Sequence, residues 1–200
     1  MREYEFLFVG GSCGSFLKTI FYYYLYKHGR YPHPVKLTVH PVTGDCHGVG
    51  QSTPNYHEPT DIEIIKQVNP TAKIVLISYE PDDLNLIIKM QYEKVFKKWL
   101  YRNKDAAEQT WPELKGRMAT PEEQENSVKA VLASGYSTWL SKIDSCEVDK
   151  IIKFKTIIGQ SDEDLNQIIT EYIQLDRLTE VEEFIKQYRL INQKYFNGNS

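Results

Sequence analysis

Six small residues near the N-terminus form the clearest candidate binding loop of the 200-residue chain. The loop, Gly10 to Ser15, contains three glycines and separates an apolar run, Tyr4 to Val9, from a long apolar and aromatic segment, Phe16 to His28. The first run has the length of a strand and the second that of a helix. A strand that enters a helix through such a loop directs backbone N–H groups and the positive end of the helix dipole at one spot. The loop therefore predicts an anion site, usually one for phosphate.

The glycine spacing differs from the two best-known phosphate-binding loops. A Walker-type loop has lysine directly after its last glycine, whereas Lys18 lies four residues beyond Gly14. The dinucleotide pattern G-x-G-x-x-G also fails, because the glycines stand at positions 10, 11 and 14. The alternative interpretation is a tight strand-to-helix turn whose glycines serve packing alone.

A second group of reactive side chains lies around a proline- and glycine-rich stretch, 41–59. Its members are residue types that bind zinc: His40, Asp45, Cys46, His47 and His57. Their spacing matches no zinc signature, so we expect no metal, and a carboxylate that orients a histidine is the simpler interpretation. Cys13 precedes a helix, where a thiol pKa can fall, but its loop lacks the arginine of a phosphatase-like cysteine site, which favours a packing role.

The elements that would position these residues alternate between strand and helix. Strands are expected at 4–9, 35–40, 73–79 and 149–156, and helices at 16–28, 60–69, 81–103, 120–143, 161–175 and 179–196. Helix caps and acidic first turns mark several of the helix starts. Lys94, Lys97 and Lys98 are interpreted as a solvated helix face. The alternation predicts one α/β domain, 1–200, with three layers, a mostly parallel sheet and a helical insertion at about 104–145.

Composition excludes several classes of protein. The chain is 41% hydrophobic and 26% charged, as in ordinary globular proteins. A formal net charge of −3 argues against a nucleic-acid partner. No apolar run reaches the roughly 20 residues that span a bilayer, and the N-terminus lacks a signal-peptide pattern, so no membrane partner is expected. Three widely spaced cysteines favour a reduced, cytoplasmic setting.

The order of the motifs resembles the sulfotransferase family, which transfers sulfuryl groups from 3′-phosphoadenosine 5′-phosphosulfate (PAPS) and has a P-loop-like α/β fold. The family's small-residue loop is similar to 11–17, and its second strand, which ends in a histidine, is similar to 37–41. The motif after its third strand corresponds to 79–87, and its late strand and helix to 151–175. The resemblance therefore covers most of the chain in order.

The resemblance implies a role for each matching residue. His40 would be the base that accepts the proton of the acceptor hydroxyl, which a small molecule or a glycan would carry. Lys18 would replace the lysine of the family's loop. The implied cofactor-binding residues are Gly11, Ser12, Cys13, Gly14, Ser15, Phe16 and Tyr79. The cofactor would be PAPS, and adenosine 3′,5′-bisphosphate would be its product.

The chain departs from the family at three positions. Ser12 stands in place of the loop lysine or arginine, Tyr79 in place of the arginine that holds the 3′-phosphate, and Ile87 in place of a serine. Other cations that could reach a phosphate are Lys89, Lys115 and Arg117. The lost cations favour an alternative, a non-catalytic protein that keeps an anion or nucleotide pocket. A small nucleotide-dependent kinase is a further alternative, although no Walker-B aspartate is evident.

Overall fold

The computed structural model describes residues 2–41, 44–46, 56–57, 61–97, 109, 112, 116, 120–143 and 146–196. Within them, three strands form a parallel sheet in the order β1-β2-β3: β1 (Tyr4–Leu7), β2 (Lys73–Ser78) and β3 (Lys150–Lys153). Leu76 of the central strand pairs with Leu7 on one side and Ile151 on the other. The unbroken apolar run of β2 is thus buried on both faces, as its sequence predicts.

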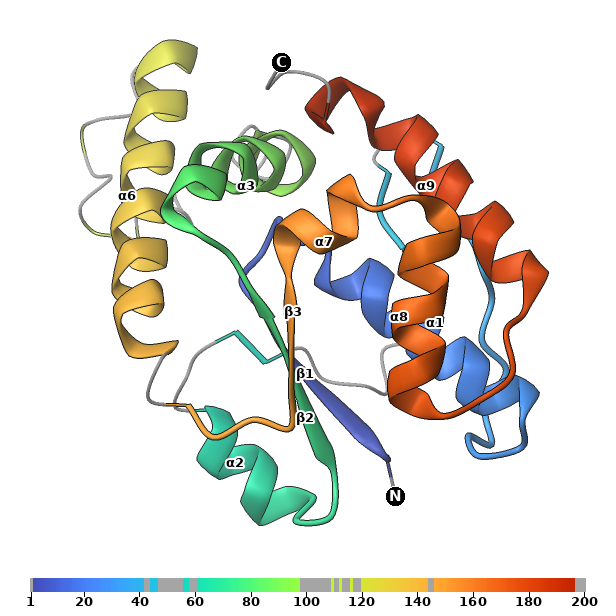
Figure 1. Ribbon diagram of the computed structural model, residues 1–200. Coiled ribbons are helices and arrows are strands. Elements are labelled where there is room, and N and C mark those ends of the chain that lie inside the picture. Colours follow the sequence, from blue (N-terminus) through green and yellow to red (C-terminus); the bar gives the residue numbers. More distant parts are fainter. Residues whose placement is uncertain are drawn as a thin grey trace.

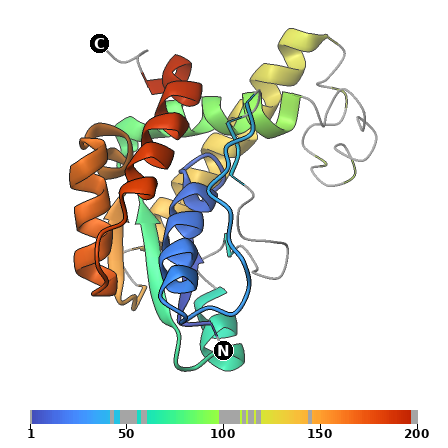
Figure 2. The same ribbon diagram turned by 90° about the vertical axis from the view of Figure 1, so that its right-hand side faces the viewer.

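Helices cover both faces of this sheet (Figures 1 and 2). On one side lie α1 (Gly14–Lys27), α8 (Asp162–Ile173) and α9 (Thr179–Phe196), and on the other lie α2 (Asp61–Val68) and α6 (Pro121–Ile143). Beyond β2, a 3-10 turn (Pro81–Asp83), α3 (Leu84–Gln91) and a π turn (Tyr92–Phe96) follow one another, and α7 (Phe154–Gly159) continues β3. The predicted α/β architecture with a parallel sheet is confirmed.

Local capping signals place the helix starts correctly. Thr120 Oγ1 accepts from the Glu123 N–H at 3.1 Å, and the Glu123 carboxylate accepts from the Thr120 N–H at 3.0 Å. This reciprocal capping box opens α6. Ser161 likewise accepts from the Asp164 N–H at 3.0 Å and begins α8. These caps satisfy N–H groups that have no partner within the helix.

Two strand predictions are wrong in part or in whole. Residues 35–40 form no strand, and within the described part of the chain their one ladder contact is an isolated bridge between Val39 and Cys46. The segment runs beside α9, so its alternation buries Val35 and Val39 against the helical layer instead of a sheet. The fourth expected strand ends at Lys153, because Phe154 and Ile157 share one buried face of α7.

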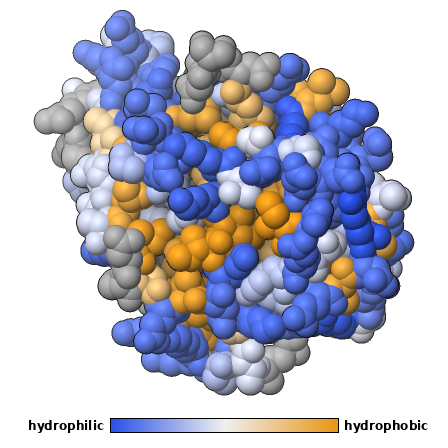
Figure 3. All heavy atoms as spheres, in the orientation of Figure 1, coloured by the Kyte–Doolittle hydropathy of each residue, from blue (hydrophilic) through white to orange (hydrophobic). Residues whose placement is uncertain are grey.

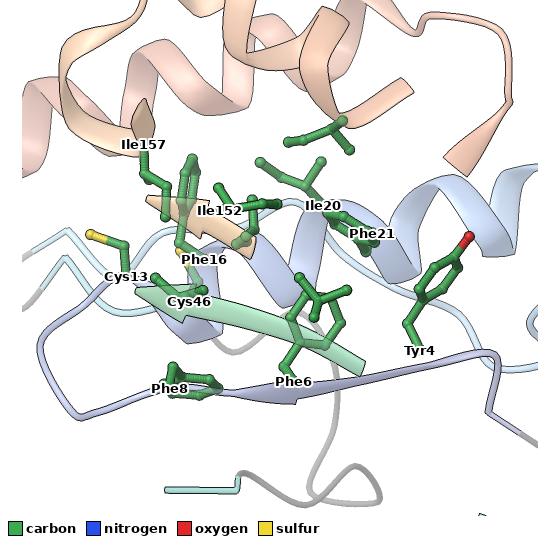
Figure 4. Packing of buried hydrophobic residues seen from close by; sticks show 14 of the residues in the cluster. Tyr4, Phe6, Phe8, Cys13, Phe16, Ile20, Phe21, Cys46, Ile152 and Ile157 are labelled. Atoms are coloured by element: carbon green, nitrogen blue, oxygen red, sulfur yellow. The ribbon is translucent and has the colours of Figure 1, made fainter. Parts of the chain in front are cut away.

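The core is unusually aromatic and lies mainly between the sheet and α1. Phe21 of α1 packs edge-to-face on Tyr4 and Phe6 of β1, with ring centroids 5.4 and 5.1 Å apart (Figure 4). Phe16, at the start of α1, stacks on Tyr188 of α9 at 3.9 Å. These contacts fix α1 between β1 and α9, and with it the loop that precedes the helix.

The surface shows one broad apolar area in the view of Figure 1. Apolar side chains gather between α6 and α8, over β3 (Figure 3), where Ile151 is 54% exposed. Among the described residues, no helix combines the length and apolarity needed to cross a membrane.

Candidate functional site

A cavity of about 250 Å³ lies where β1 passes through the glycine loop into α1. Loop residues Gly10 to Phe16, except Ser12, form its floor, and Met90, Gln91 and Lys94 close it from the chain that follows β2. Residues 44–46, His57 and Tyr188 complete the wall. The cavity therefore lies beyond the carboxyl end of a parallel strand, where ligands of open α/β sheets bind.

The first turn of α1 directs backbone N–H groups toward this cavity. The first backbone bond of the helix joins the Leu17 N–H to the Cys13 carbonyl at 3.1 Å, so the N–H groups of Gly14, Ser15 and Phe16 have no intrahelical partner. Cys13 precedes them in a left-handed conformation, with φ 64°. The positive end of the helix dipole adds to the field of these groups. This geometry is compatible with the anion site that the sequence predicts, and anion binding stays a prediction.

Packing also explains the glycines of the loop. Gly11 has φ +84°, and a Cβ on it would collide with the carbonyl oxygen of Ile87 in α3. A Cβ on Gly14 would collide with the ring of Phe8. Both glycines are thus required by close approach of neighbouring parts. The packing interpretation of these glycines is compatible with an anion site, because both glycines also line the cavity.

Lys94 brings a positive charge into the cavity wall. Its Nζ lies over the rings of Tyr188 and Tyr195, 5.6 and 5.5 Å from their centroids. Burial lowers the pKa of its ammonium, and Cys13, Asp45 and Cys46 partly oppose that effect. Among the described residues, no carboxylate lies within ion-pair distance of it. An ammonium that lies over aromatic rings, with no described carboxylate within ion-pair distance, is stabilised by an incoming anion.

His57 faces the same cavity with one ring nitrogen already engaged. Its Nδ1 lies 2.7 Å from the Phe8 carbonyl oxygen, and its ring packs edge-on against the Phe8 ring at 5.1 Å. A carbonyl oxygen only accepts, so Nδ1 carries the proton and Nε2 of the neutral ring is left as an acceptor. His57 thus has the tautomer that a general base in this cavity needs.

Two buried thiols border the cavity without forming a metal site. Cys13 and Cys46 lie beside Phe16 at one end of the core (Figure 4), and the three cysteines of the chain are free. Burial raises the pKa of both thiols, and at Cys13 the nearby Lys94 ammonium and Tyr188 hydroxyl oppose this effect only in part. Neither is therefore an activated nucleophile. No group of three metal-binding side chains occurs in the described part of the chain.

The structure brings most of the predicted cofactor-binding residues to the cavity. Gly11, Cys13, Gly14, Ser15 and Phe16 all line it. Ser12 does not, because its buried hydroxyl turns inward and donates to the Val9 carbonyl at 2.6 Å.

The other three predicted site residues lie elsewhere. The Tyr79 hydroxyl donates to the Tyr136 carbonyl at 2.6 Å, and its ring stacks on Trp139. Lys18 is buried near Glu5, and burial lowers the pKa of its ammonium to about 8. The side chain of His40 is exposed, while its backbone N–H donates to the Asp45 carbonyl.

Sequence reasoning missed the parts of the wall that arrive from distant segments. Lys94 was expected on a solvated face, and His57 was considered only as a metal ligand. His47, Lys98, Lys115 and Arg117 lie outside the described residues. Comparison of the chain with protein-family models, curated proteins and solved structures found no match.

Proposed function

We propose that the cavity binds the phosphosulfate group of PAPS and that the protein transfers its sulfuryl group to a hydroxyl. The observation that carries this proposal is the Lys94 ammonium, which borders a cavity at the N-terminus of α1 and contacts aromatic rings instead of a described carboxylate. Backbone N–H groups and one half-buried cation together favour a compact anion. The motif order that resembles sulfotransferases, and with it a P-loop-like fold, selects a sulfuryl donor among such anions.

Each group of the cavity has a role in this reaction. The acceptor hydroxyl attacks sulfur, the bond between sulfur and the bridging phosphate oxygen breaks, and adenosine 3′,5′-bisphosphate leaves with the electron pair. His57 Nε2 takes the hydroxyl proton, a role for which His57 replaces His40. Lys94 and the N–H groups of Gly14 and Ser15 stabilise the charge on the phosphosulfate oxygens.

The size of the cavity limits what it encloses. Its volume of about 250 Å³ is below the roughly 300–1,000 Å³ of pockets that enclose a drug-sized ligand. It suits the phosphosulfate group, while the nucleoside would lie outside it.

A non-catalytic anion-binding protein is the second candidate. The placement of Tyr79 and Lys18 favours it: the hydroxyl of one is engaged by α6, and the ammonium of the other lies near Glu5. Among the described residues, Lys94 is then the one lysine or arginine that lines the cavity. A multiply charged donor such as PAPS is usually bound by more than one cationic side chain.

Ligand-dependent unfolding tests the binding step. Thermal unfolding is followed with adenosine 3′,5′-bisphosphate, ATP and sulfate, for the wild type, Lys94→Met and the exposed matched control Lys97→Met. At 100 times its dissociation constant, a ligand adds about 2.7 kcal/mol of stability. We expect the bisphosphate to raise the midpoint of the wild type and of the control, and its affinity to fall at least about tenfold in Lys94→Met. No shift with any of the three ligands would refute the proposal.

Turnover separates the two candidates. PAPS is incubated with the protein and a panel of small-molecule and glycan hydroxyls, and the bisphosphate released is measured. Transfer that disappears in His57→Ala while bisphosphate binding persists supports the enzyme. Binding without transfer in the wild type supports the non-catalytic candidate.

A further inference from the structure

Tyr136, in the middle of α6, ties that helix to the glycine loop. Its hydroxyl donates to the Gly10 carbonyl oxygen at 2.9 Å, and its own carbonyl accepts from the Tyr79 hydroxyl at 2.6 Å. The Tyr79 ring stacks on Trp139, one turn further along α6, with centroids 5.4 Å apart. Tyr79, the residue after β2, is thus hydrogen-bonded to α6, and α6 is hydrogen-bonded to the glycine loop. Tyr136 itself does not line the cavity.

The hydrogen bond from Tyr136 to the Gly10 carbonyl sets the orientation of the whole Gly10–Gly11 peptide group. A trans peptide is planar, so the carbonyl of Gly10 and the N–H of Gly11 point to opposite sides of it. The Gly10 carbonyl points to Tyr136, outside the cavity, while Gly10 and Gly11 both border the cavity. The Gly11 N–H therefore points away from Tyr136 and α6. It makes no backbone hydrogen bond within the described residues.

Among the described residues, the Tyr136 hydroxyl is the partner that holds the Gly10 carbonyl of this peptide, while the Ser12 N–H closes the surrounding turn on the Val9 carbonyl. Glycine on both sides permits rotation of the peptide plane at small cost. Rotation by half a turn would replace an N–H donor at the cavity with a carbonyl oxygen, which repels an anion. Burial raises the pKa of the Tyr136 hydroxyl well above its ordinary value, so the hydroxyl remains a donor at neutral pH.

We propose that Tyr136 is a positioning residue that sets the Gly10–Gly11 peptide so that its N–H binds the anion. The inference rests on the proposed function, because it assigns a further donor to the same site. It makes α6 part of the site, although this helix contributes no side chain to the cavity wall.

Calorimetric binding of inorganic pyrophosphate tests the proposal. The variant is Tyr136→Phe, and the matched control is Tyr22→Phe, which removes a buried hydroxyl that donates to the Tyr4 carbonyl at 2.6 Å in the core. We expect about tenfold weaker binding in Tyr136→Phe, the equivalent of about 1.4 kcal/mol, and unchanged binding in Tyr22→Phe. Equal affinities of Tyr136→Phe and wild type would overturn the inference. Absence of binding to the wild type would instead refute the proposed function.

A nuclear magnetic resonance readout separates positioning from general stability. With ¹⁵N-glycine labelling, the amide resonance of Gly11 in the wild type is expected to shift on addition of pyrophosphate. The amide resonance of Gly135, in the exposed part of α6, is expected to remain unchanged. In ligand-free Tyr136→Phe, the Gly11 amide is expected to broaden or double as the peptide samples two orientations. If that variant does not fold, the wild-type titration still decides. Pyrophosphate binding that leaves the Gly11 amide unmoved contradicts the proposed orientation.

Discussion

Replacement of Lys18 by methionine is expected to stabilise the protein at neutral pH. Lys18 is 4% exposed within α1, and burial lowers the pKa of its ammonium from 10.5 to about 8. Glu5 opposes this shift and Arg2 adds to it, yet burial dominates. The carboxylate of Glu5 keeps other partners in the variant, because it pairs with Arg2 at 2.8 Å and accepts from Asn69 at 3.2 Å.

The expected magnitude follows from the two pKa values. Between pH 8 and 10.5, the unfolded chain holds a proton on Lys18 that the folded protein lacks, so stability rises with pH across this window. The penalty is full below pH 8 and disappears as the pH reaches 10.5. At about 1.36 kcal/mol per pKa unit, it amounts to at most about 3 kcal/mol. Replacement of a whole buried ion pair by apolar residues has stabilised other proteins, whereas removal of one partner alone leaves a buried charge. Lys18→Met avoids that cost because Glu5 stays paired with Arg2.

Urea unfolding measures this difference directly. The free energy of unfolding is recorded from pH 7 to pH 10.5 for Lys18→Met and for the wild type. The difference between the two cancels the contributions of groups that titrate in both proteins. We expect a gain of up to about 3 kcal/mol at pH 7 that declines toward zero at high pH. The same change at exposed Lys89 should alter stability by less than about 0.5 kcal/mol. A variant less stable than wild type at pH 7 would show that the attraction to Glu5 outweighs burial.

Two further predictions concern the loop and the thiols. Gly11→Ala forces a residue with a side chain into a left-handed conformation against the Ile87 carbonyl and should lower the free energy of unfolding in urea by at least about 1–2 kcal/mol. Gly135→Ala, in open space on α6, should instead raise it by about 0.5–1 kcal/mol. Equal effects of the two substitutions would contradict the packing described for the loop. When the native protein is treated with a thiol-specific chromogenic disulfide, one equivalent of chromophore should be released rapidly by half-buried Cys146. Buried Cys13 and Cys46 should react only after denaturation. Rapid release of three equivalents of chromophore would show that the cavity opens.

Elements with complete local signals could be predicted from the sequence. The apolar run of β2 is specific enough to place it, and the Thr120 and Ser161 caps place the starts of α6 and α8. The segment 35–40 has a strand pattern as well, but a strand needs a neighbour. Its alternation is satisfied by burial beside α9, which no local rule shows.

The candidate site was predictable only where it is contiguous in sequence. The loop and the start of α1 are contiguous in the sequence. Five of the seven predicted cofactor-binding residues, all from this segment, border the cavity. Lys94 and His57 arrive from other elements, so their positions depend on how the layers pack. Lys94 also lies within the π turn Tyr92–Phe96, whose wider turn shifts the helical phase from the 3.6-residue period used to assign it to a solvated face.

The position of α1 in the fold has a consequence for synthesis on the ribosome. This helix emerges early, but Phe16 stacks on Phe184 and Tyr188, and the Tyr24 hydroxyl hydrogen-bonds to Asn166 and accepts from the Leu178 N–H. The segments that cover its aromatic face are therefore translated after most of the chain. Until then the face of α1 that packs on α8 and α9 stays uncovered in the nascent chain, and β1 also waits for its partner β2. Translation pauses before α8 would therefore prolong the exposure of residues 16–25, whose side chains are mostly apolar or aromatic.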